Sequence, residues 1–276
     1  MFEEHLYIGI SDLKSLLFSI KMQKGIDFSE YALSSLKRRV ENFMKRFHFK
    51  DIDELSHKII KDEYFFELFL KDILVDTTEL FRDPEFWIEL RRLSFFKFRK
   101  LNSFKIFIPD SNSGEDLFSI LIMLKNEELI DKSEIVLSSL SKLNIEKIQK
   151  ATIETKKMEV NIANFEKIYE NGNIYDFFQE KGHVVKFKKE LLNNVKIIKH
   201  NFFSDELSGM YHLILFRNKA IYYNPQLKIK ALNILKEHLI TGGFIALGIK
   251  EQLEYPGSEN EFEAISETEK IYKKIF

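Results

Sequence analysis

Residues 104–124 have the sequence FKIFIPDSNSGEDLFSILIML, a short apolar run, a polar turn and a longer apolar run. Phe104–Ile108 has the length and the aromatic and branched side chains of a buried strand. The SGED segment at 113–116 then opens a helix, since Ser113 is suited to cap it and Asp116 favours the positive end of its dipole. A strand followed directly by a helix indicates a βα unit, the repeating element of a parallel sheet.

The alternation of strands and helices continues toward the end of the chain. We expect strands at Glu134–Leu137, Val195–Lys199, His212–Phe216 and Phe244–Leu247, and helices at Ile145–Lys150 and Pro225–Leu239. Gly242 and Gly243 are expected to form the turn before the last of these strands. The predicted class is α/β, a doubly wound and mostly parallel sheet covered on both faces by helices. Ligands of such sheets bind beyond the carboxyl ends of the strands.

The residues before the first strand have a different pattern. Apolar residues from Leu33 to Phe47 recur at helical spacing, and a second such pattern covers Phe65–Leu74. We therefore divide the chain into three parts and expect a small inserted subdomain where the alternation is interrupted. These parts are an all-helical N-terminal domain (1–75), a linker helix region (76–100) and the α/β domain (101–276) with its insertion at about 151–192.

Two basic segments allow alternative interpretations. The polar side of the first predicted helix carries Lys37, Arg38, Arg39, Lys45 and Arg46. This side is either a solvated face or a docking face for an acidic partner helix. The second segment, 91–105, mixes basic residues with phenylalanines, which is compatible with nucleic-acid binding or with a linker helix packed on the sheet. The net charge of −1 argues against nucleic acid as a partner.

Composition excludes several classes of protein. The 276 residues include no cysteine, which excludes disulfides, thiolate metal sites and a cysteine nucleophile. The seven histidines lack the paired spacing of metal ligands, so we predict no metal site. No basic leader precedes an apolar run, and charges interrupt every hydrophobic stretch before it could cross a bilayer. We expect a cytoplasmic protein without membrane insertion.

Four short motifs occur in a recognisable order along the chain. They are Thr78-Glu79-Leu80-Phe81-Arg82, Ser113-Gly114-Glu115-Asp116, Asn201-Phe202-Phe203 and Arg217-Asn218-Lys219-Ala220-Ile221-Tyr222. In this order and spacing the chain resembles the CheR-type protein-glutamate methyltransferases, which depend on S-adenosylmethionine. The resemblance implies a helical N-terminal domain joined to a methyltransferase domain that carries a small β-subdomain. It also implies methylation of glutamate side chains on chemoreceptors.

The same resemblance assigns roles to individual residues. Arg82 would orient the substrate carboxylate, because a planar guanidinium suits carboxylate recognition, and Tyr222 would donate a hydrogen bond near the transferring methyl group. The implied cofactor is S-adenosylmethionine, with S-adenosylhomocysteine as product. Its implied contacts are Thr78, Ser113, Gly114, Glu115, Ser139, Asn201 and Asn218. The implied partners are cytoplasmic helices of a chemoreceptor or another acidic protein, and the oligomeric state stays open.

Two positions depart from the family pattern. Asp110 stands in a loop where the family has small residues, and it adds a charge near the expected cofactor carboxylate. Ser139 stands where an acidic residue would hold the ribose hydroxyls. Charge-assisted hydrogen bonds contribute about 1.5–3 kcal/mol against about 1 kcal/mol for neutral ones, so we expect this change to weaken cofactor binding about tenfold or more. A non-catalytic module that binds a receptor or another partner is therefore the second hypothesis.

Overall fold

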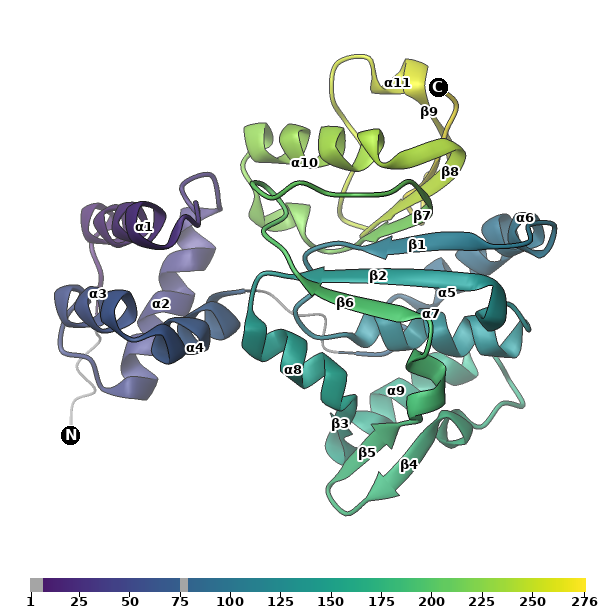
Figure 1. The fold of residues 1–276 in the computed structure, drawn as a ribbon, viewed down its shortest axis with the longest axis horizontal. Coiled ribbons are helices and arrows are strands. Elements are labelled where there is room, and N and C mark those ends of the chain that lie inside the picture. Colours follow the sequence, from purple (N-terminus) through teal and green to yellow (C-terminus); the bar gives the residue numbers. More distant parts are fainter. Residues whose placement is uncertain (1–6, 75–78) are drawn as a thin grey trace. The chain divides into compact units, whose positions relative to one another are not determined.

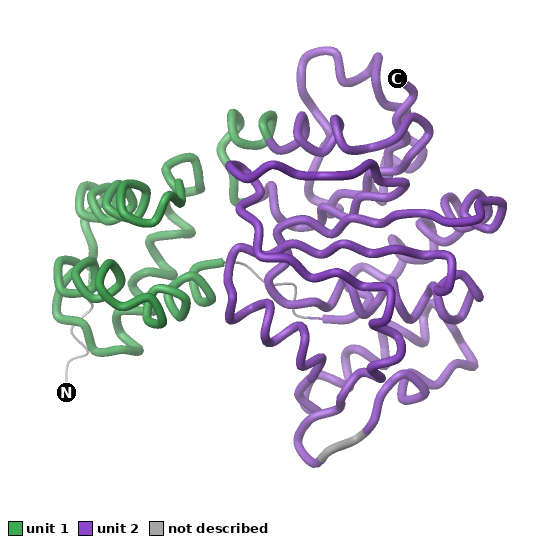
Figure 2. Tube along the Cα trace, in the orientation of Figure 1, with its two compact units in different colours: residues 1–75, 222–230 green, residues 76–221, 231–276 purple. Residues whose placement is uncertain are grey.

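The computed structural model describes residues 7–74 and 79–276, apart from the side chains of residues 180 and 181. The chain forms two compact units (Figure 2). Unit 1 comprises residues 1–75 and 222–230, and unit 2 comprises residues 76–221 and 231–276. Each unit is described by itself.

Unit 1 is helical, as the sequence predicts. Its helices are α1 (Ile10–Lys24), α2 (Leu33–Phe47), α3 (Ile52–Lys61) and α4 (Glu63–Ile73). The predicted apolar stripe of α2 faces inward, and Phe43 meets Phe69 of α4 edge-on, with 5.3 Å between ring centroids. Asp51 and Asp62 cap α3 and α4 by accepting hydrogen bonds from backbone amides in the first turns.

A second segment of unit 1 comes from far along the chain. The Ala32 amide donates to the Tyr222 carbonyl at 2.8 Å, and the Asn224 amide donates to the Glu30 carbonyl at 2.9 Å. Tyr31 and Tyr223 form an antiparallel bridge between these hydrogen bonds, and their rings meet edge-on. Residues 222–224 are thereby paired with the stretch that precedes α2.

Unit 2 contains a seven-stranded sheet in the order β6-β2-β1-β7-β8-β10-β9 (Figure 1). Strands β6, β2, β1, β7 and β8 are parallel, and β10 and β9 continue the sheet antiparallel. The predicted mostly parallel α/β sheet is confirmed. The strand bounds are β1 (Phe104–Ile108), β2 (Ser133–Ser139), β6 (Val195–Lys199), β7 (Tyr211–Phe216), β8 (Leu239–Leu247), β9 (Phe262–Ser266) and β10 (Ile271–Lys274).

Helices connect and cover these strands. They are α5 (Pro84–Leu90), the π-helical turn η1 (Arg91–Phe95), α6 (Phe96–Arg99), α7 (Glu115–Asn126), α8 (Lys142–Lys150), α9 (Met158–Glu166), α10 (Pro225–Glu237) and α11 (Ser258–Glu261), with 3-10 turns at Ile130–Lys132, Thr155–Lys157, Ile174–Phe177, Lys189–Leu192 and Ala220–Tyr222. Among the described helices, none is both long and apolar enough to span a membrane.

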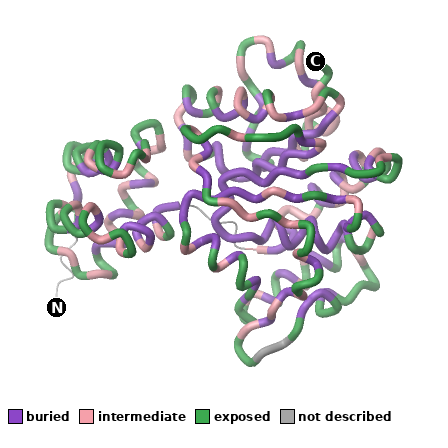
Figure 3. Tube along the Cα trace, in the orientation of Figure 1, coloured by how far each residue is buried: buried purple, intermediate pink, exposed green. Residues whose placement is uncertain are grey.

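The sheet is buried on both faces, as Figure 3 shows for its central strands. Side chains alternate between faces along a strand. Ile106 and Ile108 of β1 therefore belong to the cluster that includes α7 residues, whereas Phe107 stacks on Tyr211, with 4.8 Å between ring centroids. The aromatics of the linker helix pack on this domain, since Phe98 stacks on Phe104 at 4.5 Å. This packing agrees with the structural interpretation of segment 91–105.

An insertion forms a second, three-stranded antiparallel sheet in the order β3-β5-β4. Its strands are β3 (Thr152–Glu154), β4 (Phe178–Lys181) and β5 (Val184–Phe187). Phe187 packs against Phe118 of α7, with 4.9 Å between ring centroids. The small sheet is thereby fixed to the helix that follows β1.

Two local predictions are wrong. Ser113 does not cap α7: the cap position is Gly114, whose backbone is left-handed with a φ of 91°, and it makes no side-chain capping hydrogen bond. A left-handed turn at this point favours glycine over serine. Gly242 and Gly243 do not precede the last parallel strand but lie inside β8, where Gly242 has a φ of 74° and the pairing with β7 is irregular. Glycine permits such a bulge within a strand.

Candidate functional site

Parallel strands bring most of the predicted site residues to one edge of the sheet of unit 2. β1 lies between β2 and β7, and the chain order reverses between β1 and β7, the switch point where such sheets bind ligands. The predicted contacts that follow β1, β2, β6 and β7 all lie at this edge; they are Ser113, Gly114, Glu115, Ser139, Asn201 and Asn218. Thr78 lies outside the described residues.

The loop after β1 is held against the end of β2. The Ser111 amide donates to the Ser138 carbonyl at 2.8 Å, and the Asp110 amide donates to the Ser138 hydroxyl at 3.2 Å. Asp110 is buried and has a left-handed backbone with a φ of 47°. Aspartate tolerates this conformation better than most residues, although glycine adopts it without strain.

A neutral network stands where the resemblance implies a carboxylate. The Ser139 hydroxyl donates to Asn112 Oδ1 at 3.2 Å, and Asn144 Nδ2 donates to the same oxygen at 3.3 Å. Ser139 and Asn144 are fully buried. Asn144 belongs to the first turn of α8, which Ser141 caps. Neither amide was among the residues predicted from sequence, although Asn112 lies in the loop that departs from the family pattern.

Several buried polar atoms near this edge have no partner among the described residues. They are Asn144 Oδ1, both ring nitrogens of His200 and Asn218 Nδ2. The His200 amide donates to the Ser139 carbonyl at 3.0 Å, so His200 follows β6 directly beside the end of β2. A buried polar group without a hydrogen bond costs about 1–3 kcal/mol. These atoms at the sheet edge could therefore form hydrogen bonds with a bound ligand.

Glu251 organises the loop after β7. Its buried carboxylate accepts backbone hydrogen bonds from Asn218 at 2.8 Å, from Ile221 at 3.2 Å and from Gly248 at 2.6 Å. Asn218 has a left-handed backbone with a φ of 57°. A Cβ at Gly248 would lie 2.7 Å from the Asn218 side-chain oxygen, so the close approach of the two loops requires glycine. Glu251 carries no sequence motif, and its role depends on tertiary structure.

The backbone around Arg82 is tightly fixed. Phe81 and Asp83 both have left-handed backbones, with φ values of 52° and 57°. The Phe81 amide donates to the Ser119 hydroxyl at 2.8 Å, and Trp87 Nε1 donates to the Arg82 carbonyl at 3.0 Å. The Arg82 side chain is 38% exposed, and its Nε lies 4.0 Å from a carboxylate oxygen of Asp83. A partly exposed guanidinium thus projects from a constrained turn.

Tyr222 lies in unit 1, beside the basic helix α2. The Arg39 guanidinium lies 4.6 Å from the centroid of the Tyr222 ring. Arg39 is held there by hydrogen bonds of 2.6 Å to the Ile73 carbonyl and 2.9 Å to the Ser35 hydroxyl. Burial lowers the pKa of Arg39, and the interaction with Tyr222 opposes that shift. The structure therefore places Tyr222 with Arg39, whereas Arg82 belongs to unit 2.

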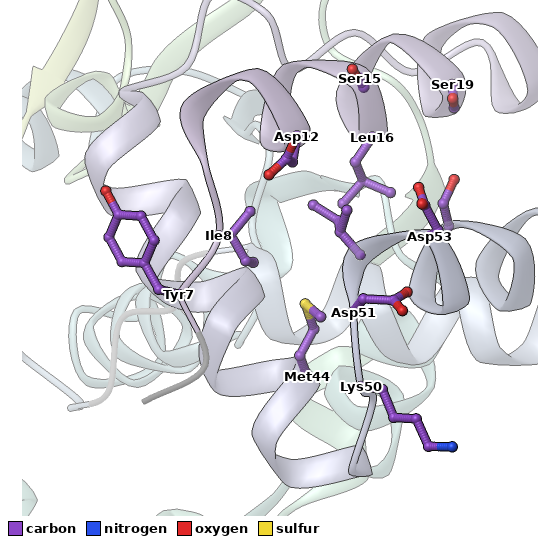
Figure 4. A pocket seen from close by; sticks show the side chains of 12 residues that line it. Tyr7, Ile8, Asp12, Ser15, Leu16, Ser19, Met44, Lys50, Asp51 and Asp53 are labelled. Carbon is purple, nitrogen blue, oxygen red and sulfur yellow. The ribbon is translucent and has the colours of Figure 1, made fainter. Parts of the chain in front are cut away.

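Two cavities in the described parts of the units contain none of the eight predicted site residues that the structure describes. A cavity of about 420 Å³ in unit 1 lies between α1 and the start of α3, and its lining includes Asp12, Ser15 and Asp53 (Figure 4). A cavity of about 750 Å³ in unit 2 lies near the amino ends of β2 and β6, with Asp131 and Asn194 in its lining. The second cavity is therefore at the sheet edge opposite the predicted site.

Comparison with known proteins identifies the family of the chain. The profile described as CheR methyltransferase, SAM binding domain, matches residues 76–271, and the profile described as CheR methyltransferase, all-alpha domain, matches residues 11–74. The chain belongs to the CheR methyltransferase family. The Pseudomonas putida protein Cher3 is 23% identical over 263 residues, covering 95% of this chain and 96% of that protein. The chemotaxis protein methyltransferase of Listeria monocytogenes is 21% identical over 239 residues, covering 86% and 88%.

The cofactor of this CheR-type methyltransferase is S-adenosylmethionine. The unpartnered polar atoms at the carboxyl ends of β2, β6 and β7 fit a ligand rich in hydroxyls and amines. Asn112, Ser139 and Asn144 would face the ribose as neutral groups, and Asn218 would hold a second polar part of the cofactor. These individual contacts remain predictions.

Proposed function

We propose that this CheR-type chain methylates glutamate side chains on the cytoplasmic helices of a chemoreceptor. The observation that carries the proposal is Arg82, whose guanidinium is partly exposed while its backbone is fixed by two left-handed neighbours and two side-chain hydrogen bonds. A guanidinium carried on a fixed backbone can orient a carboxylate at a lower entropic cost than one carried on a mobile loop. Family members named chemotaxis protein methyltransferases in two Listeria species support the class of substrate.

Methyl transfer to a glutamate carboxylate requires alignment of the methyl donor and the carboxylate, and no proton transfer. S-adenosylmethionine, when bound, supplies an electrophilic methyl group. A glutamate carboxylate is already ionised near neutral pH, so the protein has no general base to provide. Arg82 orients the accepting carboxylate through one oxygen or both, and its partial exposure keeps that ion pair weak enough to leave the carboxylate nucleophilic. Tyr222, for which the family resemblance implies a hydrogen bond near the transferring methyl group, belongs to unit 1, and its part in the reaction remains a prediction.

The basic face of α2 would bind the acidic receptor helix. Three of its five basic residues are used within unit 1: Lys37 lies over the Tyr7 ring at 3.5 Å, Arg39 binds the Ile73 carbonyl, and Arg46 pairs with Asp72. Arg38 and Lys45 are exposed, seven residues apart on one side of the helix. These two cations are spaced to meet carboxylates on an adjacent helix.

Methyl transfer tests the proposal directly. Incubation with S-adenosylmethionine labelled in its methyl group should label a purified cytoplasmic domain of a chemoreceptor from the same organism. Because carboxyl methyl esters hydrolyse readily in base, mild alkali should release the label as methanol. Base-stable label would exclude glutamate as the acceptor.

Cofactor titration separates the enzyme from a non-catalytic binding module. We expect calorimetry to detect binding of S-adenosylhomocysteine to this protein. Binding of the receptor domain without detectable cofactor binding at millimolar concentration would favour the module, for which the neutral group at Ser139 would then be the physical reason.

A further inference from the structure

Arg217 is a fully buried arginine at the end of β7. Its Nη2 donates to Asp83 at 2.8 Å and to the Arg82 carbonyl at 3.1 Å, and its Nη1 donates to Asp116 at 3.3 Å. The guanidinium also lies 3.9 Å from the centroid of the Phe86 ring. One side chain thus joins the turn around Arg82, the first turn of α7 and the helix that follows the turn.

The burial of this charge is balanced by its partners. Removal from water lowers the pKa of Arg217, and the carboxylates of Asp116 and Asp83 oppose that shift. An arginine keeps its charge in such a setting because its intrinsic pKa is so high. A fully buried cation with two carboxylate partners is an expensive arrangement, and similar apolar packing would stabilise a fold equally well or better. The arrangement therefore suggests a function in positioning.

The geometry identifies what is positioned. Arg82 lies between two residues with positive φ, a backbone conformation that residues other than glycine adopt only at an energetic cost. Arg217 binds the carbonyl of Arg82 and the carboxylate of Asp83. The first contact holds the main chain at the position from which the Arg82 side chain projects, and the second holds the side chain of the next residue. Asp83 is an anion that could pair with Arg82, whose Nε lies 4.0 Å from the Asp83 carboxylate.

We propose that Arg217 is a positioning residue for Arg82. By binding Asp83 and the Arg82 carbonyl together, it holds the turn in its strained form and directs the Asp83 carboxylate away from full pairing with Arg82. The Arg82 guanidinium is thereby kept available for the substrate carboxylate. This inference rests on the proposed function of Arg82 and extends it to a residue that does not touch the substrate.

A double-mutant cycle tests the coupling. Arg217→Lys and Asp83→Asn are each made in the wild-type protein and in Arg82→Lys, and methyl transfer to the receptor domain is measured as kcat and KM. In the wild-type background we expect each change to lower kcat about tenfold or more, since small misplacements of orienting groups have effects of this size. In the Arg82→Lys background the same changes should lower kcat less than about twofold, because the guanidinium that they position is already absent.

Further measurements separate positioning from general damage. The affinity for S-adenosylhomocysteine should stay within about threefold of the wild-type value in all variants, since the changes affect the turn proposed to orient the methyl-accepting carboxylate and not the cofactor contacts. Asp83 is partly exposed, so Asp83→Asn keeps the test valid even if Arg217→Lys fails to fold. Equal losses of kcat in both backgrounds, or loss of cofactor binding in step with kcat, would overturn the inference. Unchanged kcat in Arg82→Lys alone would instead refute the proposed function of Arg82.

Discussion

The turn around Arg82 and the sheet edge that carries the predicted cofactor contacts, which we call the cofactor edge, belong to the same unit. They differ in whether their polar groups have hydrogen-bond partners. At the turn, the Phe81 amide, the Arg82 carbonyl and the Asp83 carboxylate all have protein partners. At the edge, buried polar atoms of His200 and Asn218 have none among the described residues. The polar groups of the turn thus have their partners within the protein, whereas the sheet edge has buried polar atoms left over for a ligand.

This difference has an energetic meaning. A fixed turn lowers the entropic cost of orienting a substrate in each turnover. Unsatisfied buried groups destabilise the protein by about 1–3 kcal/mol each and return that free energy when a ligand satisfies them. Substitutions at the turn should therefore lower turnover. Substitutions that remove an unpartnered polar group at the cofactor edge should raise the stability of the free protein and lower its affinity for the cofactor.

The largest expected effect is at the turn. Arg82→Ala should lower turnover roughly 100-fold or more, the size expected when one orienting or charge-stabilising group is removed. The affinity for S-adenosylhomocysteine should change less than about threefold, because the backbone contacts of the turn are kept. Turnover is measured by methyl transfer to the receptor domain and affinity by calorimetry.

Arg92→Ala is the matched control. Arg92 lies in η1, the π-helical turn that follows α5, is exposed, and pairs with Glu89. Its loss should leave turnover within about twofold, as an exposed ion pair contributes little. If both variants lose turnover equally, general basicity of the segment matters and the fixed turn does not.

At the cofactor edge we expect a smaller effect, in which stability rises and cofactor affinity falls. His200→Leu removes a buried imidazole whose two nitrogens have no partner among the described residues. We expect the free energy of unfolding without ligand to rise by about 1 kcal/mol. The affinity for S-adenosylhomocysteine should fall about threefold to tenfold. Denaturant unfolding and calorimetry measure the two quantities.

His212 provides the contrasting control. Its Nδ1 accepts a 3.1 Å hydrogen bond from the Lys105 amide, on the part of β7 away from the cofactor edge. His212→Leu should therefore destabilise the protein and leave cofactor affinity unchanged. If His200→Leu also destabilises the protein, the His200 nitrogens are not a reserve for ligand binding.

The sequence predicts the five parallel strands because each contains a short apolar run, whereas β9 and β10, with the sequences FEAIS and IYKK, lack such a run and are not predicted. Phe104–Ile108 and Val195–Lys199 have the expected bounds, and α2 buries the apolar stripe that its spacing predicts. Ser113 shows the limit of such reasoning. A serine before a helix suggests a cap, but the left-handed turn at Gly114 depends on how the loop meets neighbouring elements.

The site is predictable only where a motif marks it. Arg82 and Asn218 belong to recognisable motifs, and the structure places Asn218 at the expected edge. Glu251 and Asn144 carry no signal of their own, because their roles depend on which loops approach them in space. Long-range contacts between side chain and backbone leave no periodic trace in a sequence.

The smallest expected effect concerns the position of the missing carboxylate. Ser139→Asp places a charge in a fully buried position beside the Asn112 amide. Without ligand the variant should be less stable, since a buried carboxylate is costly unless it is hydrogen-bonded. Bound ribose hydroxyls would supply those hydrogen bonds, so the affinity for S-adenosylhomocysteine should rise a few-fold, within the roughly tenfold range expected for a charge-assisted pair.

Ser139→Asn isolates the charge from the change of shape. Asparagine has nearly the shape of aspartate but no charge, so it should not improve affinity. Calorimetry on both variants then distinguishes two states of the cofactor edge. A gain confined to aspartate means that the edge still has the geometry of a ribose site and lacks only the charge. A loss in both variants means that Asn112, Ser139 and Asn144 form a neutral site whose hydrogen bonds depend on the small serine.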